Sequence, residues 1–530
     1  MSVGPAQARV RRGARAGMLA PLVLLVASCF DPPYPAELAC SEESQCPPGQ
    51  FCDEVSGICR LGENGNGNGN GNGNGNGNGN GNGNGKSNIP TSLTRDLDVL
   101  FVLDDSNLMD DQHGALAAQL PELLEALEAS AVGLPDLHVG VVSTDMGADP
   151  VEDPDSAPPA PNCEGDGHDG RLIVGENDEG CAGLDDRWIE DYRGEDGERE
   201  RNYDTDLEEL LSCMVTVGES GCGFGMPLKA LTRAAEREEN QDFFRESADL
   251  AVVFLTTEDD CSTEDGRMFG GNPFAGLDEP LGPLASFRCT DFGVRCDDVG
   301  CDEFPRDLRC EGERQNCEPD PDSPYMDTPQ DYAAALREHT PGERLMLAGI
   351  WGELAPFDVA HEPVNDIVYA RLLAACEPPG LDFEFPAGRD VYPASPPVRL
   401  EAFLDQFSDT LSTSICEEDF EGPAARIGER LQDRVSTGCI EAPLTDTEPG
   451  DSEIQPDCEV ISEDGAKAGD EDATSLPACE DVDSNTTCYS IAPAERCGHA
   501  PDGLELTIER GDGPPLAAPP RLRCVTDSGD

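Results

Sequence analysis

The sequence has very little positive charge. Its 530 residues include 35 lysines and arginines against 108 aspartates and glutamates, which gives a formal net charge of -73. Lysine is almost absent and occurs only at Lys86, Lys229 and Lys467. Such a chain repels the phosphates of nucleic acids, so direct nucleic-acid binding is excluded. The acidity suits solubility, the binding of divalent cations, or life in high salt.

Catalytic signatures are also lacking. The six histidines are scattered along the chain, and there is no G-x-S-x-G elbow, H-E-x-x-H helix or phosphate-binding loop. His361-Glu362 is followed by Pro363, which does not continue a zinc-protease helix. We therefore predict a protein that is not an enzyme.

No apolar run is long enough to span a membrane comfortably. The run from Met18 to Ala27 follows a segment rich in arginine, as in a secretory signal. It ends in Val26-Ala27-Ser28-Cys29, which resembles a bacterial lipobox. In a lipobox, small residues precede a cysteine that is lipidated and becomes the mature N-terminus. The resemblance implies that Cys29 carries a lipid anchor and that residues 1–28 are removed, with an ordinary secretory signal as the alternative.

Cysteine, by contrast, is abundant. With Cys29 assigned to lipid, an even number of the 23 cysteines remains. An exported chain meets an oxidising compartment, so we predict that these cysteines form disulfides, Cys376 and Cys416 among them. Zinc binding is the alternative, but the scattered histidines and the absence of a C-x-x-C pair disfavour it.

Composition divides the chain after the signal peptide into four segments. Residues 29–60 form a small module that needs disulfides in place of an apolar core, and its cysteines are Cys40, Cys46, Cys52 and Cys59. Residues 61–91 are a flexible linker, because their Asn-Gly repeat has no apolar side chain to bury. Residues 92–416 carry the strongest strand and helix patterns. Residues 417–530 read as a helix near 420–435 followed by a small disulfide-stapled, β-rich module.

The longest of these patterns begins the segment 92–416. Val99 to Leu103 is an unbroken apolar run, typical of a strand that is buried on both faces. Further strands are expected at 137–142, 249–255 and 345–350, with an edge strand at 171–174. Helical spacing occurs between and after them, at 116–127, 207–214, 228–235, 332–339 and 400–411. Alternating strands and helices predict an α/β fold with a doubly wound sheet.

Polar residues stand where the predicted strands end. In open α/β sheets, ligands bind at the carboxyl ends of the strands. Asp104 and Ser106 follow the first strand, and Thr256 to Asp260 follow the strand at 249–255. The pattern Asp104-x-Ser106 after a buried strand resembles the first metal-binding segment of a von Willebrand factor type A (vWA) domain, which usually reads D-x-S-x-S.

This resemblance implies a metal-ion-dependent adhesion site that holds Mg²⁺ or Ca²⁺ through oxygen ligands. Matched onto this chain, its ligands are Asp104, Ser106, Thr257 and Asp259. The site is degenerate, because Leu108 replaces the second serine of the motif and Thr257 stands where an aspartate is expected. The segment before the helix at 228–235 also lacks the expected threonine. No cofactor is therefore certain, and an improvised cation site is the alternative, built from Asp105, Asp110, Asp145, Asp259 or Asp260.

Two insertions follow predicted strand ends, at about 146–169 and 261–326. Both should emerge on the face that carries Asp104, where elaborated loops can acquire a specific partner. We predict a cell-surface lipoprotein, anchored in the outer membrane or cell surface only through its lipid. Its function would be adhesion or another interaction with a protein or polysaccharide. The alternatives are an acidic surface protein that binds divalent cations and an unrecognised exported hydrolase.

The lipobox makes a direct prediction. The variant Cys29→Ala should remain unprocessed or be released from the membrane fraction, because it cannot accept the lipid. Cell fractionation and gel mobility measure this. A variant that fractionates and migrates like the wild type would contradict the lipoprotein assignment.

Overall fold

The computed structural model describes residues 50–53, 58–61 and, with gaps, 86–525. The gaps are at 108, 148–161, 164, 195–196, 273–274, 298–300, 302, 341, 355, 365–366, 374, 377–393, 418–420, 448–453 and 463–473. The predicted functional residues Cys29, Cys40, Cys46 and Leu108 therefore lie outside the described residues. The chain divides into two units, Met1–Asn82 and Gly83–Asp530, and each is described by itself.

In the first unit the described residues form a hairpin. Strands β1 (Gln50–Asp53) and β2 (Ile58–Leu61) pair antiparallel, and Cys52 stands opposite Cys59 in the register.

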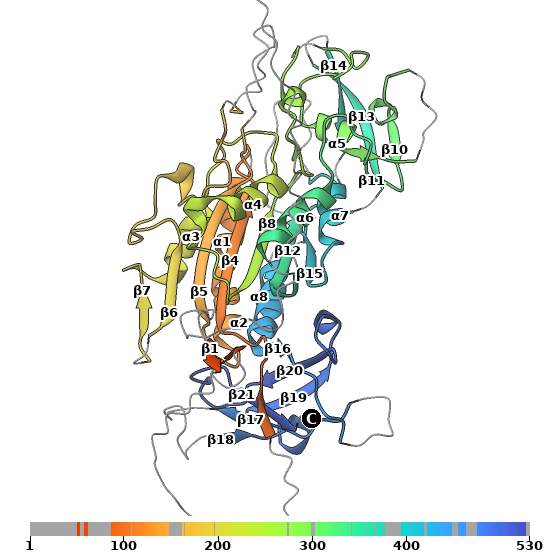
Figure 1. The fold of residues 1–530 in the computed structure, drawn as a ribbon. Helices are drawn as coiled ribbons and strands as arrows, with labels where there is room; N and C mark the ends of the chain where they lie inside the picture. The colour runs from red at the N-terminus through yellow and green to blue at the C-terminus, as the bar shows by residue number, and fades with distance from the viewer. Residues whose placement is uncertain are drawn as a thin grey trace, which may run out of the picture. The chain divides into compact units, whose positions relative to one another are not determined.

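A seven-stranded sheet is the centre of the second unit. Its order is β15-β12-β8-β4-β5-β6-β7 (Figure 1). The strands are β4 (Asp96–Leu103), β5 (Asp136–Ser143), β6 (Ile189–Arg193), β7 (Arg199–Arg201), β8 (Asp249–Leu255), β12 (Leu345–Trp351) and β15 (Thr410–Ser414). The five strands from β15 to β5 are parallel, and β6 and β7 continue the sheet antiparallel. The predicted α/β class is confirmed as a mixed α/β structure with several sheets.

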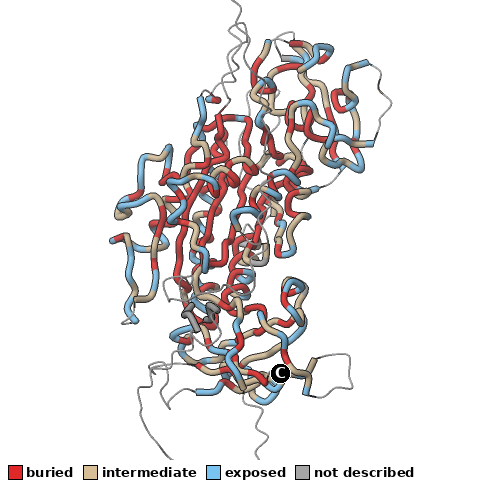
Figure 2. The backbone as a smooth tube through the Cα atoms, in the orientation of Figure 1, coloured by how far each residue is buried: buried red, intermediate tan, exposed pale blue. Residues whose placement is uncertain are grey.

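Strand β4 lies in the middle because it is apolar on both faces. Leu100 and Val102 point into one core, whereas Val99, Phe101 and Leu103 point into the other. All five side chains are at most 2% exposed, and Figure 2 shows the buried residues concentrated on the central strands. Side chains of a strand alternate between the two faces of its sheet, so an unbroken apolar run requires cover on both sides.

Helices supply this cover on both faces. The core of Leu100 receives side chains of α4 (Pro227–Glu236), α6 (Pro329–His339) and α7 (Val398–Leu404). The opposite core receives those of α1 (Asp110–Ala117), α2 (Leu120–Glu128), α3 (Leu207–Val215) and α8 (Glu421–Ser436). No helix in the described part of the chain combines the length and apolar character needed to cross a bilayer.

Two elements differ from the sequence prediction. Residues 171–174 are not a strand, although Ile173 N–H donates to the Val141 carbonyl at 2.9 Å. The strand that pairs with β5 on this side is β6. The mixed polar sequence of β6 gives little indication of a strand. The helix predicted over 400–411 ends at Leu404, and the β-branched, hydroxyl-rich segment 410–414 forms β15. The helix predicted near 420–435 is confirmed as α8.

Two insertions, one after β8 and one after β12, together form an accessory region. It contains α5 (Phe287–Gly293) and the strands β9 (Val294–Arg295), β10 (Gly312–Arg314), β11 (Glu318–Pro319), β13 (Phe357–Val364) and β14 (Ile367–Leu372). Strand β10 from the first segment pairs with β13 from the second, so the order is β10-β13-β14 (Figure 1). The second segment is an insertion that the sequence did not reveal.

Buried arginines hold the accessory region together. Arg288 donates to the carbonyl oxygens of Met268, Gly270, Gly282 and Pro283, so one guanidinium fixes a whole loop. Arg309, Arg314 and Arg399 are also at most 1% exposed. A guanidinium offers five donors, which suits the many backbone carbonyls of a buried loop.

The C-terminal residues form two small sheets. Their strands are β16 (Thr437–Cys439), β17 (Cys458–Ser462), β18 (Thr474–Leu476), β19 (Cys488–Pro493), β20 (Leu504–Glu509) and β21 (Arg521–Val525). The orders are β16-β20-β19 and β18-β17-β21-β3. Strand β3 (Lys86–Ile89) comes from the end of the predicted linker, so the linker ends earlier than residue 91.

Short 3₁₀ segments complete the described structure, at Glu176–Asp178, Glu238–Asn240, Gly266–Phe269, Asp307–Arg309, Gly342–Arg344, Cys479–Asp481 and Glu495–Cys497.

Disulfides are confirmed throughout the second unit. The bonded pairs are Cys163–Cys222, Cys181–Cys213, Cys261–Cys289, Cys296–Cys317, Cys301–Cys310, Cys376–Cys416, Cys439–Cys497, Cys458–Cys524 and Cys479–Cys488. Disulfides at this density indicate an oxidising compartment outside the cytoplasm.

A buried ion network fastens α8 to the sheet. Arg434 contacts Asp249 at 3.1 Å and Asp409 at 2.7 Å, and all three side chains are at most 8% exposed. Asp409 also pairs with Arg430 at 2.6 Å, but the Arg430 side chain is 45% exposed. Arg434 and Arg430 therefore contact the same carboxylate but differ in burial, so their variants can be compared directly.

The variant Arg434→Met should lower the free energy of unfolding by about 3–5 kcal/mol, because it leaves two carboxylates buried without their shared cation. Arg430→Met should cost below about 1 kcal/mol, as for an exposed pair. Urea denaturation followed by circular dichroism measures both. Equal, small losses for the two variants would show that the network does not hold α8.

Candidate functional site

The carboxyl ends of three neighbouring strands place three polar residues side by side. Asp104 N–H donates to the Leu255 carbonyl at 3.0 Å, and Thr144 N–H donates to the Leu103 carbonyl at 2.9 Å. Thr256 follows β8 on the other side of Asp104. The parallel ladder thus continues one residue beyond each strand and fixes the backbone of the site.

Asp104 is buried and receives two hydrogen bonds from within the protein. Its Oδ1 accepts from Ser106 N–H at 2.9 Å, and its Oδ2 accepts from the Thr256 hydroxyl at 2.7 Å. The Asp104 carbonyl contacts Nε2 of His113 at 2.9 Å. Asp104 and Ser106, the two residues that match the vWA motif, are therefore brought together.

The other two predicted ligands have different neighbours. The Thr257 hydroxyl lies 3.6 Å from Sδ of Met109, and the adjacent Thr256 contacts Asp104 instead. Asp259 accepts from the N–H groups of Arg399 at 3.0 Å and Leu400 at 3.3 Å, which are in the first turn of α7. Asp259 thus caps a helix, a role that a buried carboxylate fills well because helix N-terminal N–H groups lack partners.

Glu258 is a residue of this edge that the sequence did not single out. The pKa of its carboxyl is raised to about 8, mainly by burial and secondly by the nearby Asp104 carboxylate, while a hydrogen bond with Ser286 opposes the shift. Its Oε2 is buried and has no hydrogen-bond partner among the described residues. Nothing in the local sequence distinguishes Glu258 from the many other acidic residues.

A second cluster lies beside Asp104 and consists of Asp105, Asp145 and His168. One ligand atom from each lies within 4.8 Å of the others, and Asp105 Oδ2 is 3.9 Å from His168 Nε2. Burial raises the pKa of Asp105 to about 8; a hydrogen bond from Ser143 opposes the shift, and Asp145 and Asp104 add to it. Burial also raises the pKa of Asp145 and lowers that of His168.

Glycines make room for the two carboxylates of this cluster. A Cβ at Gly221 would lie 2.1 Å from Asp105 Oδ1, and a Cβ at Gly167 would lie 2.5 Å from Asp145 Oδ1. Gly167 also has φ +52°, which favours glycine. Within the loop, Asp145 Oδ1 accepts from Gly147 N–H at 2.8 Å, and the Asp145 carbonyl accepts from His168 N–H at 2.8 Å.

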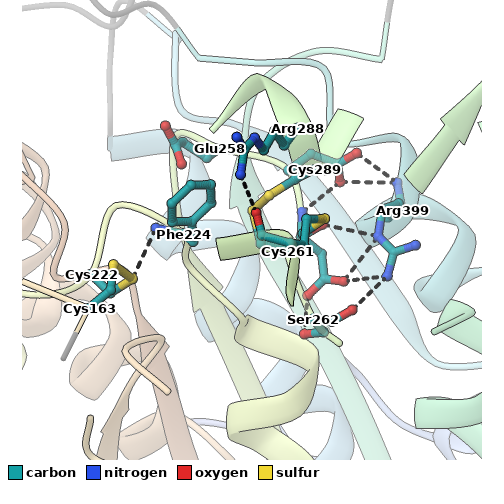
Figure 3. Close-up of a disulfide and its surroundings, with 12 residues drawn as sticks. Cys163, Cys222, Phe224, Glu258, Cys261, Ser262, Arg288, Cys289 and Arg399 are labelled. Carbon is teal, nitrogen blue, oxygen red and sulfur yellow. Dashed lines mark hydrogen bonds and ion pairs between the residues drawn. A yellow bond between two sulfur atoms is a disulfide. The ribbon is translucent and has the colours of Figure 1, made fainter. Parts of the chain in front are cut away.

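Two disulfides fix the loops around these clusters. Cys163–Cys222 joins the insertion that carries Gly167 and His168 to the loop that carries Gly221 (Figure 3). Cys261–Cys289 joins the segment after β8 to α5, next to the network in which Arg399 contacts Asp260 at 2.9 Å (Figure 3). The loops at this edge are therefore covalently stapled to each other.

Asp104, Ser106, Asp105 and Asp145 were candidates from the sequence, whereas His168 was read as an isolated histidine. The signal that marks His168 is its position shortly after Cys163 and directly after Gly167, and it becomes interpretable only with the Cys163–Cys222 pairing.

Comparison with known proteins does not assign the chain to a family. No protein-family model matches it, and no curated protein matches it. Among solved structures, it is similar to the pilus adhesin SpaC from Lactobacillus rhamnosus GG in its open conformation, with 9% sequence identity and a TM-score of 0.28. The alignment covers 83% of this chain and 39% of the adhesin, so the chain spans well under half of that protein.

The degenerate motif predicts a specific gain of function. By the vWA resemblance, positions 108 and 257 carry oxygen ligands of the same site as Asp104 and Ser106, so the double variant Leu108→Ser with Thr257→Asp restores both of them. We expect millimolar Mg²⁺ to change the melting temperature of the wild type little and to raise that of the double variant. An ion at about 100 times its dissociation constant stabilises by about 2.7 kcal/mol, which differential scanning calorimetry detects.

Adding Asp104→Ala to the double variant is the control and should abolish the Mg²⁺ effect. A large Mg²⁺ shift in the wild type that Asp104→Ala removes would show an intact site. No gain in the double variant would place the vWA alignment of these segments in error.

Proposed function

We propose that the chain is an exported, cell-surface binding protein with a vWA-like domain, and that it acts by binding a protein or polysaccharide and not by catalysis. The observation that carries this proposal is the position of the insertions. The segments 146–169, 261–326 and 352–397 each follow a parallel strand at its carboxyl end, and the residues around Asp104 lie at that same edge. Ligands of open α/β sheets bind at this edge.

The strand order supports the vWA-like part of the proposal. A seven-stranded sheet with β4 in the centre, five parallel strands, antiparallel β6 and β7 at one end, and helices on both faces supports the doubly wound sheet expected from the Asp104-x-Ser106 motif. The motif stands directly after the central strand, as the resemblance requires.

Surface chemistry supports a binding role for the accessory region. Four large apolar side chains stand out as exposed among the described residues, and three of them belong to segment 352–376: Leu354 at 59%, Val368 at 40% and Leu373 at 36%. The fourth, Tyr192, is 39% exposed and lies on β6, away from that segment in the sheet order. Exposed apolar side chains in an accessory region on a rigid scaffold favour contact with a partner.

The anchor and tether complete the proposal. A lipid on Cys29 and the Asn-Gly linker would hold the second unit away from the membrane surface. The acidic surface keeps the exported chain soluble and disfavours anionic partners, so a neutral or basic partner fits best.

The test uses the exported chain without its lipid, residues 30–530, carrying a fluorescent label. Flow cytometry on intact cells of the producing organism and surface plasmon resonance on its isolated surface polysaccharides and proteins measure binding. We expect saturable binding that weakens at least tenfold in the triple variant Leu354→Ser, Val368→Ser and Leu373→Ser.

Tyr192→Ser is the matched control, since it removes a similar exposed side chain from another part of the sheet, and it should leave binding unchanged. Equal binding by the wild type and the triple variant would place the binding surface elsewhere. No saturable binding to any of these surfaces would overturn the proposed function.

A further inference from the structure

Most of the buried aspartates in the described part of the chain have arginine partners. The pairs are Asp98 with Arg245, Asp136 with Arg95, Asp191 with Arg199, Asp249 and Asp409 with Arg434, Asp260 with Arg399, and Asp291 with Arg309. Removing a carboxylate from water is costly unless it is paired with a cation or binds a metal.

Asp105 and Asp145 are exceptions to this rule. Asp105 is 4% exposed and Asp145 is 8% exposed, yet no arginine or lysine in the described part of the chain forms an ion pair with either carboxylate. Asp105 Oδ1 is buried and has no hydrogen-bond partner among the described residues. By contrast, Ser106 and Thr256 hydrogen-bond both oxygens of the neighbouring Asp104, and Asp145 Oδ1 accepts from Gly147 N–H.

The third member of the cluster supplies a nitrogen. Nε2 of His168 lies 3.9 Å from Asp105 Oδ2, and the His168 side chain is 23% exposed. Two carboxylates and one imidazole are a common ligand set for divalent first-row transition metals, whereas Mg²⁺ and Ca²⁺ prefer oxygen ligands alone. Three protein ligands with one side open to solvent leave room for a water or another ligand on the metal.

The geometry is close to that of a metal centre. The three ligand atoms lie within 4.8 Å of one another, whereas two atoms bound at about 2.1 Å to one ion are at most about 4.2 Å apart. Asp105 Oδ2 and His168 Nε2, at 3.9 Å, are already within this range. Gly221 and Gly167 leave no space for a side chain beside the two carboxylates, and the Cys163–Cys222 disulfide joins the loops around them.

We propose that Asp105, Asp145 and His168 bind one divalent transition-metal ion of the Zn²⁺ or Mn²⁺ class. The ion neutralises the two buried carboxylates and ties the ends of β4 and β5 to the insertion that carries His168. This site is separate from the Asp104 motif in its ligands and in the metal it selects, and it does not depend on which partner the loops bind.

The test measures metal binding to chelator-treated protein of residues 30–530 by isothermal titration calorimetry. We expect one equivalent of Zn²⁺ to bind in the presence of millimolar Mg²⁺ and Ca²⁺, which occupy the weak sites of the acidic surface. His168→Ala and Asp145→Asn should each lower the Zn²⁺ affinity at least tenfold. His339→Ala is the matched control, because His339 is exposed on α6, and it should bind Zn²⁺ like the wild type.

Circular dichroism and urea denaturation check that the variants fold. If they do not, Co²⁺ added to the wild type decides, since ligation by nitrogen and carboxylate gives a d–d spectrum that differs from that of the hydrated ion and that Mg²⁺ does not abolish. Zn²⁺ affinity that is unchanged in His168→Ala and Asp145→Asn would overturn the proposal. So would uptake of several equivalents that Mg²⁺ displaces, or a Co²⁺ spectrum equal to that of the hydrated ion.

Discussion

Much of this structure depends on one constraint. Its buried carboxylates need cationic partners, and the chain has few basic side chains to provide them. In a chain with a net charge of -73, arginine is the cation that enters the interior. Arg434 joins α8 to the amino ends of strands β8 and β15, and Arg399 joins α7 to the segment after β8. Both arginines act between elements that are far apart in the sequence. Where no arginine is present, at Asp105 and Asp145, the structure presents the ligands of a cation instead.

The central strands could be predicted from the sequence, whereas their neighbours could not. The run at Val99 to Leu103 is apolar on both faces, and only a strand inside a covered sheet needs such a pattern. Strands β6 and β15 consist largely of polar, partly exposed residues. Their place in the sheet therefore depends on pairing with the neighbouring strands more than on their own sequence. The insertion of β13 and β14 escaped notice because its partner, β10, lies in another insertion.

The candidate site shows the same limit. Asp104 and Ser106 belong to one short motif and were found from it. The alignment also suggested Asp259, but the structure uses that carboxylate to cap α7, a helix that begins well over a hundred residues later. His168 lies near Asp105 because the Cys163–Cys222 disulfide and the turn at Gly167 hold its loop against the sheet. Contacts of this kind depend on the folded path of the chain, and no local pattern encodes them.

The pairing of β3 with β21 has a mechanical consequence. Strand β3 is the first element of the second unit, so a pull on the segment before Lys86 reaches this strand before it reaches β4. Antiparallel hydrogen bonds to β21 share that force, and the Cys458–Cys524 disulfide prevents β21 from being drawn away from β17. Beyond β3, Ser92 N–H donates to the Cys439 carbonyl at 2.9 Å and forms a second attachment. Tension applied before Lys86 would therefore load the C-terminal sheets before it loads the central sheet and its carboxyl edge.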